Sequence, residues 1–466
     1  MNTRLNADDR NGSLVMERAQ RVSPKASLGF AAVLMAVYVA GLLLFMETSS
    51  YETWGGVLIA PILVLITLPI FTRQAAREGN RSLFWLLVLA LLIKLAGAIV
   101  FHFVAYDLYG GVADAATYHE GGVIVAERFR AGNYDSGLDS LTGVNFIQLL
   151  AGILYTIIGP TKFGGYLFFS WLGFLGLFFF YRAFTIAVPE GRARTYARFV
   201  FFLPSLAFWP SSIGKEAWMM LALGVAAFGA ARVLSGRTWR GLLITGLGMW
   251  MAALVRPHMG ALLGVALALG YLLRRPRPDL RQLAPIAKGL SMAALALVAT
   301  VAVVRAERFL KVHGVDTDRG LAGAQRSLVT RTSTGGSYFP PSILQSPTQA
   351  PNAVLTVLFR PLPLEAHNPQ ALVASLENSF LLLFTLVRIP WGLAALRSMR
   401  RQPYVALALV YTAMFIVAFS SFANFGLLVR ERVQVLPFFV ALLCIPPRPK
   451  EPVPAAVDAP GWRVSS

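Results

Sequence analysis

The sequence predicts an all-α membrane protein, a polytopic transmembrane helical bundle of about 12 helices (roughly 11 to 13) with outer-face loops and juxtamembrane helices. Of its 466 residues, 56% are hydrophobic, and the mean hydropathy is +0.60. A soluble chain of this composition would expose an unusually large apolar surface. Apolar runs long enough to cross a bilayer recur along the chain. A lipid bilayer is therefore its expected surroundings.

The candidate spans are apolar runs separated by short polar connections. They cover residues 28–46, 54–72, 83–104, 163–182, 199–213, 216–234, 241–255, 259–273, 286–304, 371–396, 404–422 and 427–445. The shortest would reach only about 22 Å, so they need locally thin membrane or extended ends. Together they form a transmembrane domain at 28–445, between a basic segment at 1–27 and a tail at 446–466.

The net charge of +19 would suggest nucleic acid as a partner of a soluble protein, but the positions of the arginines indicate membrane topology instead. Alternate loops are basic, with Arg73, Arg77 and Arg81 in one, Arg182, Arg192, Arg194 and Arg198 in the next, and Arg232, Arg237 and Arg240 in a third. The positive-inside rule places these loops and both termini in the cytoplasm. No nucleic-acid partner is expected.

Two long connections then fall on the outer side, at 105–162 and 305–370. The apolar run 144–159 inside the first would invert the charge pattern if it spanned, so we expect a short re-entrant or juxtamembrane helix there. The second is rich in arginine and proline. A solvated basic loop is one interpretation of it, and a cover that clamps an anionic phosphate is the other.

Lys94 and Cys444 lie inside apolar runs. A lysine at the centre of a span costs about 2.5–3.5 kcal/mol to insert, so Lys94 should face a partner or a water-filled cavity. The single cysteine excludes a disulfide framework, and no Cys/His cluster suggests zinc.

The remaining polar residues gather at the predicted outer boundary, mostly beside Pro or Gly. Irregular polar backbone at that depth is tolerated where protein or a wet cavity surrounds it, which predicts a shared outward-facing cleft. Its candidate members are Asp107, Asp114, Tyr118, His119, Glu120, Lys215, Glu216, Arg256, His258, Arg360, Glu365, Arg430, Glu431 and Arg432.

Each candidate has a purely structural alternative. Asp114 also fits a solvated turn, and Lys215 and Glu216 also fit an ion pair with each other. Arg256 would also anchor a helix end by snorkelling. Arg430 and Arg432 flank Glu431, a pattern that also suits a charge-balanced turn.

Four sequence elements follow one another in the first half of the chain. An Asp-Ala-x-x-Tyr element begins at Asp114, an apolar stretch ends in Gly159-Pro160, and a run closes at Tyr181-Arg182-Ala183. A Pro-Ser-x-x-Phe-Trp-x-Ser-x-x-Gly-Lys-Glu segment follows, ending at Glu216. Together these elements resemble the GT-C superfamily of polytopic glycosyltransferases, and the resemblance covers roughly the first 260 residues. It implies transfer from lipid-linked sugars on the outer face of the membrane, with Asp114 as the catalytic carboxylate. Ala115 and Ala116 replace the second acid common in that superfamily, which leaves a divalent metal such as Mg²⁺ or Mn²⁺ an open question.

Chemistry assigns roles to the same residues. Transfer from a polyprenyl-phosphate sugar needs a base for the acceptor hydroxyl and cations for the leaving phosphate. We expect Asp114 to be the base, with Glu120 or His119 as secondary candidates. Substrate and phosphate binding would fall to Tyr118, Lys215, Glu216, Arg256, His258, Arg360, Arg430 and Arg432.

The expected function is that of a glycosyltransferase of the bacterial cytoplasmic membrane, with its active site facing the periplasm or exterior. Its partners would be a polyprenyl-phosphate sugar donor and a glycan, lipid or protein acceptor. Two alternatives stay open. A polymerase or ligase of lipid-linked glycans would depend on arginines, as the segments around Arg360 and from Asn424 to Arg432 suggest, and a lipid-linked sugar flippase would make no new bond.

Overall fold

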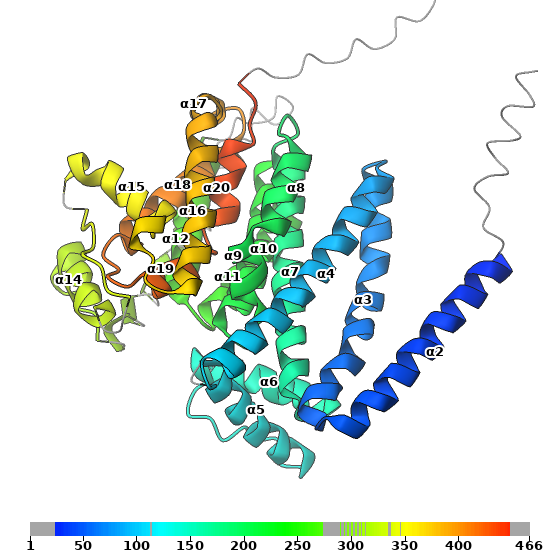
Figure 1. Ribbon diagram of the computed structural model, residues 1–466. Coiled ribbons are helices and arrows are strands. Elements are labelled where there is room, and N and C mark those ends of the chain that lie inside the picture. Colours follow the sequence, from blue (N-terminus) through cyan, green and yellow to red (C-terminus); the bar gives the residue numbers. More distant parts are fainter. Residues whose placement is uncertain are drawn as a thin grey trace, which may run out of the picture.

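The computed structural model describes residues 24–111, 114–273, 314–333, 337–344 and 346–447, with scattered residues between 289 and 312 (Figure 1). Throughout this part of the chain the secondary structure is helical, apart from one antiparallel bridge between Tyr338 and Asn424. The predicted all-α class is confirmed. The terminal segments 1–27 and 446–466 lie almost wholly outside the described residues.

Among the residues that the structure describes, five helices are long and apolar enough to cross a membrane. They are α3 (Tyr51–Arg77), α4 (Arg81–Phe103, continued by a π-helical turn at Val104–Leu108), α7 (Lys162–Ala187), α10 (Lys215–Leu234) and α16 (Pro369–Val387). A sixth span results if α17 (Ile389–Ser398) and α18 (Pro403–Phe419), which meet at 118°, are taken together.

The expected count of about 12 spans is therefore not confirmed. Three predicted spans are broken helices. The span 199–213 contains the end of α8 (Ala193–Phe202), then α9 (Pro204–Phe208) and η2 (Trp209–Ser211). The span 371–396 divides into α16 and α17, and the span 427–445 divides into α19 (Phe425–Arg432) and α20 (Leu436–Leu443). Proline follows each break, at Pro204, Pro390 and Pro437, because it removes a backbone donor and cannot continue the preceding helix.

The remaining elements are shorter, apart from one at the amino-terminal end. They are α2 (Pro24–Thr48), α5 (Asp114–Arg130), α6 (Val144–Ile158), α11 (Thr238–Ala253), α12 (Pro257–Leu272), α14 (Gly320–Thr332), η4 (Pro347–Gln349), α15 (Ala350–Phe359) and η5 (Pro363–Glu365). Both predicted outer loops thus contain helices. Most of the predicted span 286–304 lies outside the described residues.

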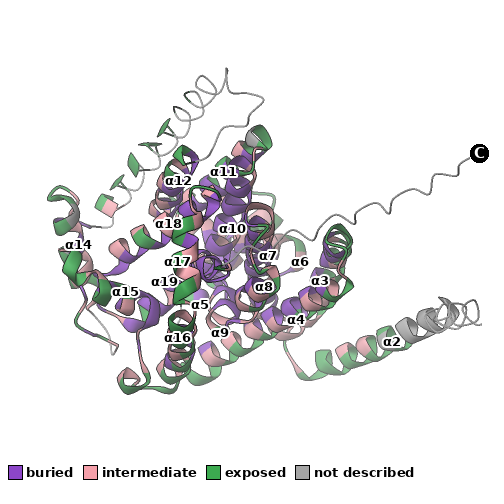
Figure 2. Cartoon of the chain, turned by 90° about the horizontal axis from the view of Figure 1, so that it is seen from above, coloured by how far each residue is buried: buried purple, intermediate pink, exposed green. Residues whose placement is uncertain are grey.

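Helices α7 and α10 form the centre of the bundle (Figure 2). Buried positions make up 72% of the apolar window of α7 and 83% of that of α10, against 17% for α16. Glycines allow the two backbones to meet: a Cβ added to Gly176 would lie 2.3 Å from the carbonyl oxygen of Met220, and one added to Gly224 would lie 2.3 Å from that of Gly176. Small residues at a helix crossing give membrane helices this close packing.

Lys94 is completely enclosed in the bundle, and its partners are backbone carbonyls. Its Nζ donates to the carbonyl oxygens of Leu206 at 2.8 Å and Ala207 at 3.3 Å, where α9 gives way to η2. Carbonyls near a helix end lack intrahelical donors. The lysine thus satisfies the backbone at the break in the predicted 199–213 span.

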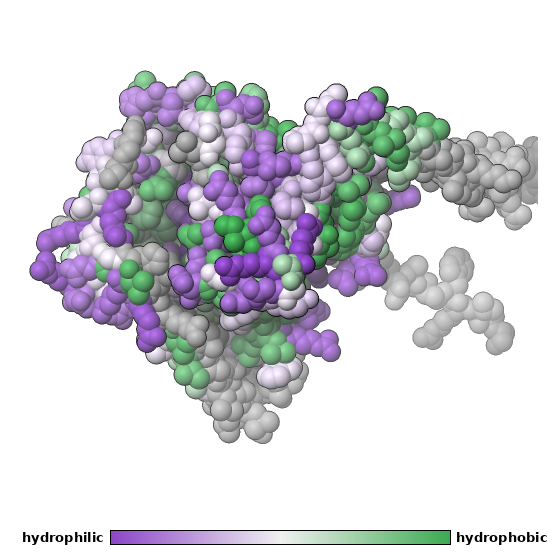
Figure 3. Space-filling model, turned by 90° about the horizontal axis from the view of Figure 1, so that it is seen from below, coloured by the Kyte–Doolittle hydropathy of each residue, from purple (hydrophilic) through white to green (hydrophobic). Residues whose placement is uncertain are grey.

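Polar residues lie at both ends of the bundle. Helices α5 and α6 lie together at the lower end in Figure 1, and hydrophilic residues cover much of that face in Figure 3. The turns after α3 and α7 and the described end of the chain lie at the upper end. Arg192 and Arg388 meet there, because both guanidinium groups lie over the ring of Trp391.

Candidate functional site

Five charged residues from four separate segments meet near the lower end of the bundle. They are Asp114, Glu216, Arg256, Arg430 and Glu431, and we call them the charge cluster. Arg430 Nη1 lies 2.8 Å from Asp114 Oδ2, and Arg430 Nε lies 2.7 Å from Glu216 Oε1. Arg256 Nη2 lies 2.9 Å from Glu216 Oε1 and 2.6 Å from Glu431 Oε1. The convergence expected from the sequence is present for these residues.

These side chains lie at helix starts or in a short helix, where the chain is interrupted. Asp114 opens α5, Glu216 lies in the first turn of α10, and Arg256 immediately precedes Pro257 at the start of α12. Arg430 and Glu431 lie in the short helix α19, whose amino end is capped by the side chain of Asn424. A carboxylate near a helix amino terminus is stabilised by the helix dipole, which suits both Asp114 and Glu216.

The charge cluster is buried at one end and open at the other. Side-chain exposure is 2% for Glu216, 11% for both Arg256 and Glu431, 23% for Arg430 and 59% for Asp114. Burial alone would lower the pKa of Arg430, but Glu216 and Asp114 outweigh it and raise that pKa. Burial raises the pKa of the Glu431 carboxyl. The accessible carboxylate is Asp114, held on one oxygen by a cation.

Tyr118 and Lys215 adjoin the charge cluster. Tyr118 lies one turn after Asp114, on the same face of α5, and is buried. Burial, and then the charges of Asp114 and Glu216, raise the pKa of its phenol, so the hydroxyl keeps its proton at neutral pH. Lys215 is half-buried and within electrostatic range of the charge cluster, yet it makes no hydrogen bond or ion pair with any described residue.

His119 and Glu120, the secondary candidates for the base, point away from the charge cluster. Each residue turns an α-helix by about 100°, so neither shares the face of Asp114 and Tyr118. His119 Nδ1 lies 2.8 Å from Tyr155 Oη, and its Nε2 lies 3.5 Å from Glu52 Oε1. Burial lowers the pKa of His119, which favours a neutral ring that ties α5 to α6 and α3. Glu120 is exposed.

Arg360 and Arg432 occupy a different position from the charge cluster. Arg360 Nη2 pairs with Glu365 Oε1 at 2.5 Å, and its guanidinium lies over the rings of Phe339 and Phe425. Arg432 is fully buried and donates to the carbonyl oxygen of Val357 at 2.7 Å, to Asn378 Oδ1 at 2.5 Å and to the carbonyl oxygen of Arg360. These contacts join α15, α16 and α19, a structural role that the sequence pattern did not indicate.

His258 lies in the first turn of α12, two residues after Arg256, and is half-buried. Its nearness in sequence to Arg256 places it beside the charge cluster.

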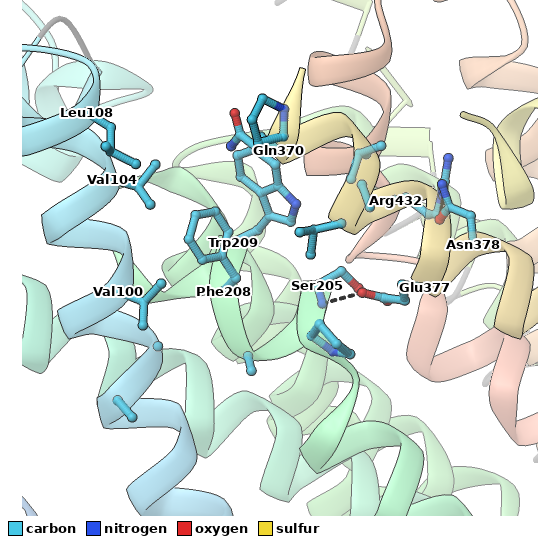
Figure 4. Close-up of a pocket in the computed structure, with 18 of the residues that line it drawn as sticks. Val100, Val104, Leu108, Ser205, Phe208, Trp209, Gln370, Glu377, Asn378 and Arg432 are labelled. Carbon is cyan, nitrogen blue, oxygen red and sulfur yellow. Dashed lines mark hydrogen bonds between the residues drawn. The ribbon is translucent and has the colours of Figure 1, made fainter. Parts of the chain in front are cut away.

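An apolar cavity of about 760 Å³ is lined by residues of α4, α9, α16 and α19, and none of its lining residues belongs to the charge cluster. In Figure 4, Val100 of α4 and Val104 and Leu108 of the π-helical turn that continues it lie on one side, near Phe208 and Trp209. Glu377, Asn378 and Arg432 lie on the other side. The lining residues Val429 and Arg432 flank Arg430 in α19. The cavity and the charge cluster therefore share one short helix.

The sequence analysis missed this cavity. Its wall combines α4 with the broken region around α9 and with α16, which are far apart in the chain. Glu377 Oε1 and Oε2 accept hydrogen bonds from Ser205 Oγ at 2.6 Å and from its backbone amide at 2.7 Å. The sequence feature that could have indicated this cavity is Pro204. It breaks the predicted 199–213 span and leaves the backbone amide of Ser205 free to donate to Glu377 of α16.

The carboxylates of the charge cluster face arginines, and within the described residues no group of three or more His, Cys, Asp or Glu side chains is placed to hold a metal ion. This arrangement suits proton transfer and the binding of an anion. A divalent metal as a cofactor stays an open expectation.

A comparison with protein families, curated proteins and solved structures finds no match for this chain. The resemblance to the GT-C superfamily therefore remains a prediction from the quoted motifs.

Proposed function

We propose that this protein is a membrane glycosyltransferase that moves a sugar from a polyprenyl-phosphate donor to a hydroxyl of a cell-envelope acceptor. The acceptor would be a glycan, lipid or protein at the outer face of a bacterial cytoplasmic membrane. One observation carries the proposal: an exposed carboxylate, Asp114, is paired with the half-buried Arg430, whose helix α19 also lines an apolar cavity. These are the groups that such a transfer needs, arranged in one place.

The reaction assigns one step to each group. Arg430 holds Asp114 Oδ2, which leaves Oδ1 to take the proton of the acceptor hydroxyl. The acceptor oxygen then attacks the anomeric carbon, and the bond from that carbon to the phosphate oxygen breaks. The polyprenyl phosphate leaves with the electron pair. General-base catalysis of this kind contributes about 10²- to 10⁴-fold.

Lys215 is the first cation available to the leaving phosphate. Arg256 and Arg430 are already paired with carboxylates, whereas Lys215 has no such partner among the described residues. Arg256 keeps one further donor, because its Nη1 is buried without a hydrogen-bond partner in the described part of the chain. Fixed cations aimed at developing charge stabilise the transition state without reorganisation.

The apolar cavity suits the hydrocarbon of the donor. Its lining on α4 extends from Ile93 to Leu108, roughly 22 Å of helix. That length exceeds the depth of one leaflet, about 15 Å. Val100 and Val373, on α4 and α16, are both largely exposed, so the lining continues onto the lipid-facing surface. A lipid tail in the cavity would bring its phosphate to α19.

The test is a transfer assay on purified protein in nanodiscs, with a panel of labelled polyprenyl-phosphate sugars and measurement of donor consumption and product. Asp114→Asn keeps one acceptor oxygen for Arg430 but removes the base, so activity should fall about 10²- to 10⁴-fold. Glu120→Gln is the matched control, an exposed carboxylate on the same helix, and should retain activity. Full activity in Asp114→Asn would overturn the proposal.

The unpartnered Nη1 of Arg256 favours a second candidate, an arginine-dependent polymerase or ligase of lipid-linked glycans. Two variants distinguish these two functions. Loss of transfer in Arg256→Lys together with full activity in Asp114→Asn would support the polymerase or ligase. Movement of a labelled lipid-linked sugar across the bilayer without any new glycosidic bond would support a flippase.

A further inference from the structure

Three arginines gather at the end of the bundle opposite the charge cluster. Arg77 ends α3, Arg182 lies near the end of α7, and Arg232 lies in the last turn of α10. We call them the arginine trio.

Packing of the central helices brings these side chains together. The guanidinium carbons of Arg182 and Arg232 lie 4.6 Å and 5.6 Å from the centroid of the same ring, that of Phe228. The hydroxyl of Tyr181 donates to Glu78 Oε2 at 2.7 Å, which fastens the end of α3, and with it Arg77, to α7. Three helices therefore fix the arginine trio.

The positive charge of this group is not balanced by protein. Glu78, the residue after Arg77, is a carboxylate at this end, and neutral groups donate to both of its oxygens: Gln74 Nε2 donates to Oε1 at 2.7 Å, and Tyr181 donates to Oε2. No guanidinium of the arginine trio forms an ion pair with any residue that the structure describes. The Nε of Arg232 is buried and has no hydrogen-bond partner in the same part of the chain.

We propose that the arginine trio is a binding site for the phosphate of an anionic lipid headgroup. A buried guanidinium nitrogen without an acceptor is costly, and a phosphate oxygen is the acceptor that guanidinium groups bind best. One carboxylate against three arginines leaves an excess charge that a phosphate group would offset. The site is separate from the charge cluster and does not depend on the proposed transferase activity.

Two exposed tryptophans favour a lipid as the source of the phosphate. Trp85 lies near the start of α4 and is 69% exposed, and Trp239 begins α11 and is 72% exposed. Both lie toward the same end of the bundle as the arginine trio, because α4 begins just after Arg77 ends α3 and α11 begins just after α10 ends. Exposed tryptophan marks the headgroup level of a bilayer, so the three arginines lie where lipid phosphates lie.

The experiment measures lipid retention by native mass spectrometry on protein from nanodiscs of neutral lipid doped with phosphatidic acid or phosphatidylglycerol. Wild-type protein should retain an anionic lipid. Arg182→Gln and Arg232→Gln should each lower the apparent affinity roughly fivefold, the effect of about 1 kcal/mol per basic residue. Arg182→Lys, which keeps the charge, should lose less. The matched control is Arg240→Gln, an exposed arginine at the same end.

Each remaining outcome decides the proposal. An equal loss in Arg240→Gln would show general surface attraction and overturn the specific site. A second experiment adds inorganic phosphate. If the protein retains phosphate as strongly as the lipids, and phosphate competes with them fully, the assignment to a lipid is wrong. Circular dichroism and melting in neutral lipid check that the variants fold. If Arg182→Gln fails to fold, Arg77→Gln tests the same site from α3.

Discussion

The Arg430 guanidinium lies 2.8 Å from the Asp114 carboxylate, although 316 residues separate them in the chain. The same guanidinium binds Glu216, so a single side chain of α19 links the start of α5 to the start of α10. Four predictions follow from this arrangement and from its surroundings, in addition to the loss of transfer expected for Asp114→Asn.

Arg430→Ala should destabilise the protein strongly. It removes one of the two cations that compensate Glu216, whose side chain is only 2% exposed. Removing one partner of a buried pair typically costs about 3–5 kcal/mol. Thermal unfolding in detergent should show the loss, and the double variant Arg430→Ala/Glu216→Gln should recover part of it. A melting curve like that of the wild type would contradict the described contacts.

Lys215→Ala and Arg432→Ala should separate binding from folding. Lys215 has no partner in the described structure, so its removal should leave the melting temperature nearly unchanged while it weakens donor binding about ten- to a hundredfold, the effect of one hydrogen bond to a charged group. Arg432→Ala leaves two buried acceptors and one half-buried acceptor without their donor, so it should reduce the yield of folded protein. Size-exclusion profiles and the transfer assay measure the two effects, and the reverse pattern would refute the assignment.

Gly224→Ala should destabilise the crossing of α7 and α10. A Cβ there would lie 2.3 Å from the carbonyl oxygen of Gly176, so the two helices must separate. Overpacking of this kind typically costs about 1–3 kcal/mol. The control is Gly246→Ala in α11, where an added Cβ meets nothing within 4 Å. Equal melting temperatures for the two variants would show that the crossing is not tight.

Acid should weaken the connection between α15 and α16. Partial burial alone would raise the pKa of Glu365, but hydrogen bonds from Arg360 and the Leu362 amide outweigh it and hold that pKa below its ordinary value. A lowered pKa contributes stability above the unfolded-state value of about 4.3, and this contribution is lost as the pH falls through the folded-state value. Melting temperatures between pH 7 and pH 3 should therefore fall less in Glu365→Gln than in the wild type. Parallel curves would exclude this linkage.

The candidate site was only partly predictable. The sequence could select four of its members, Asp114, Glu216, Arg256 and Arg430. A charged residue beside a helix break in an apolar chain costs free energy to bury, so it is expected to have a partner or a function. Arg432 and His119 met the same criterion, yet they hold helices together. The difference lies in which side of a short helix each residue faces. Neighbouring residues differ by about 100°, and their orientation depends on what the helix packs against.

The sequence by itself determined the helical class, the apolar character of the long helices and the gathering of arginines in alternate loops. These are local properties, since hydropathy and charge act on each segment separately. Only the tertiary structure decided how many spans stay unbroken, that the side chains of Arg430 and Asp114 meet, and that α4, α9 and α16 enclose a cavity. Such outcomes depend on contacts between segments hundreds of residues apart, and no local pattern of residues encodes the rotation and crossing of helices that create them.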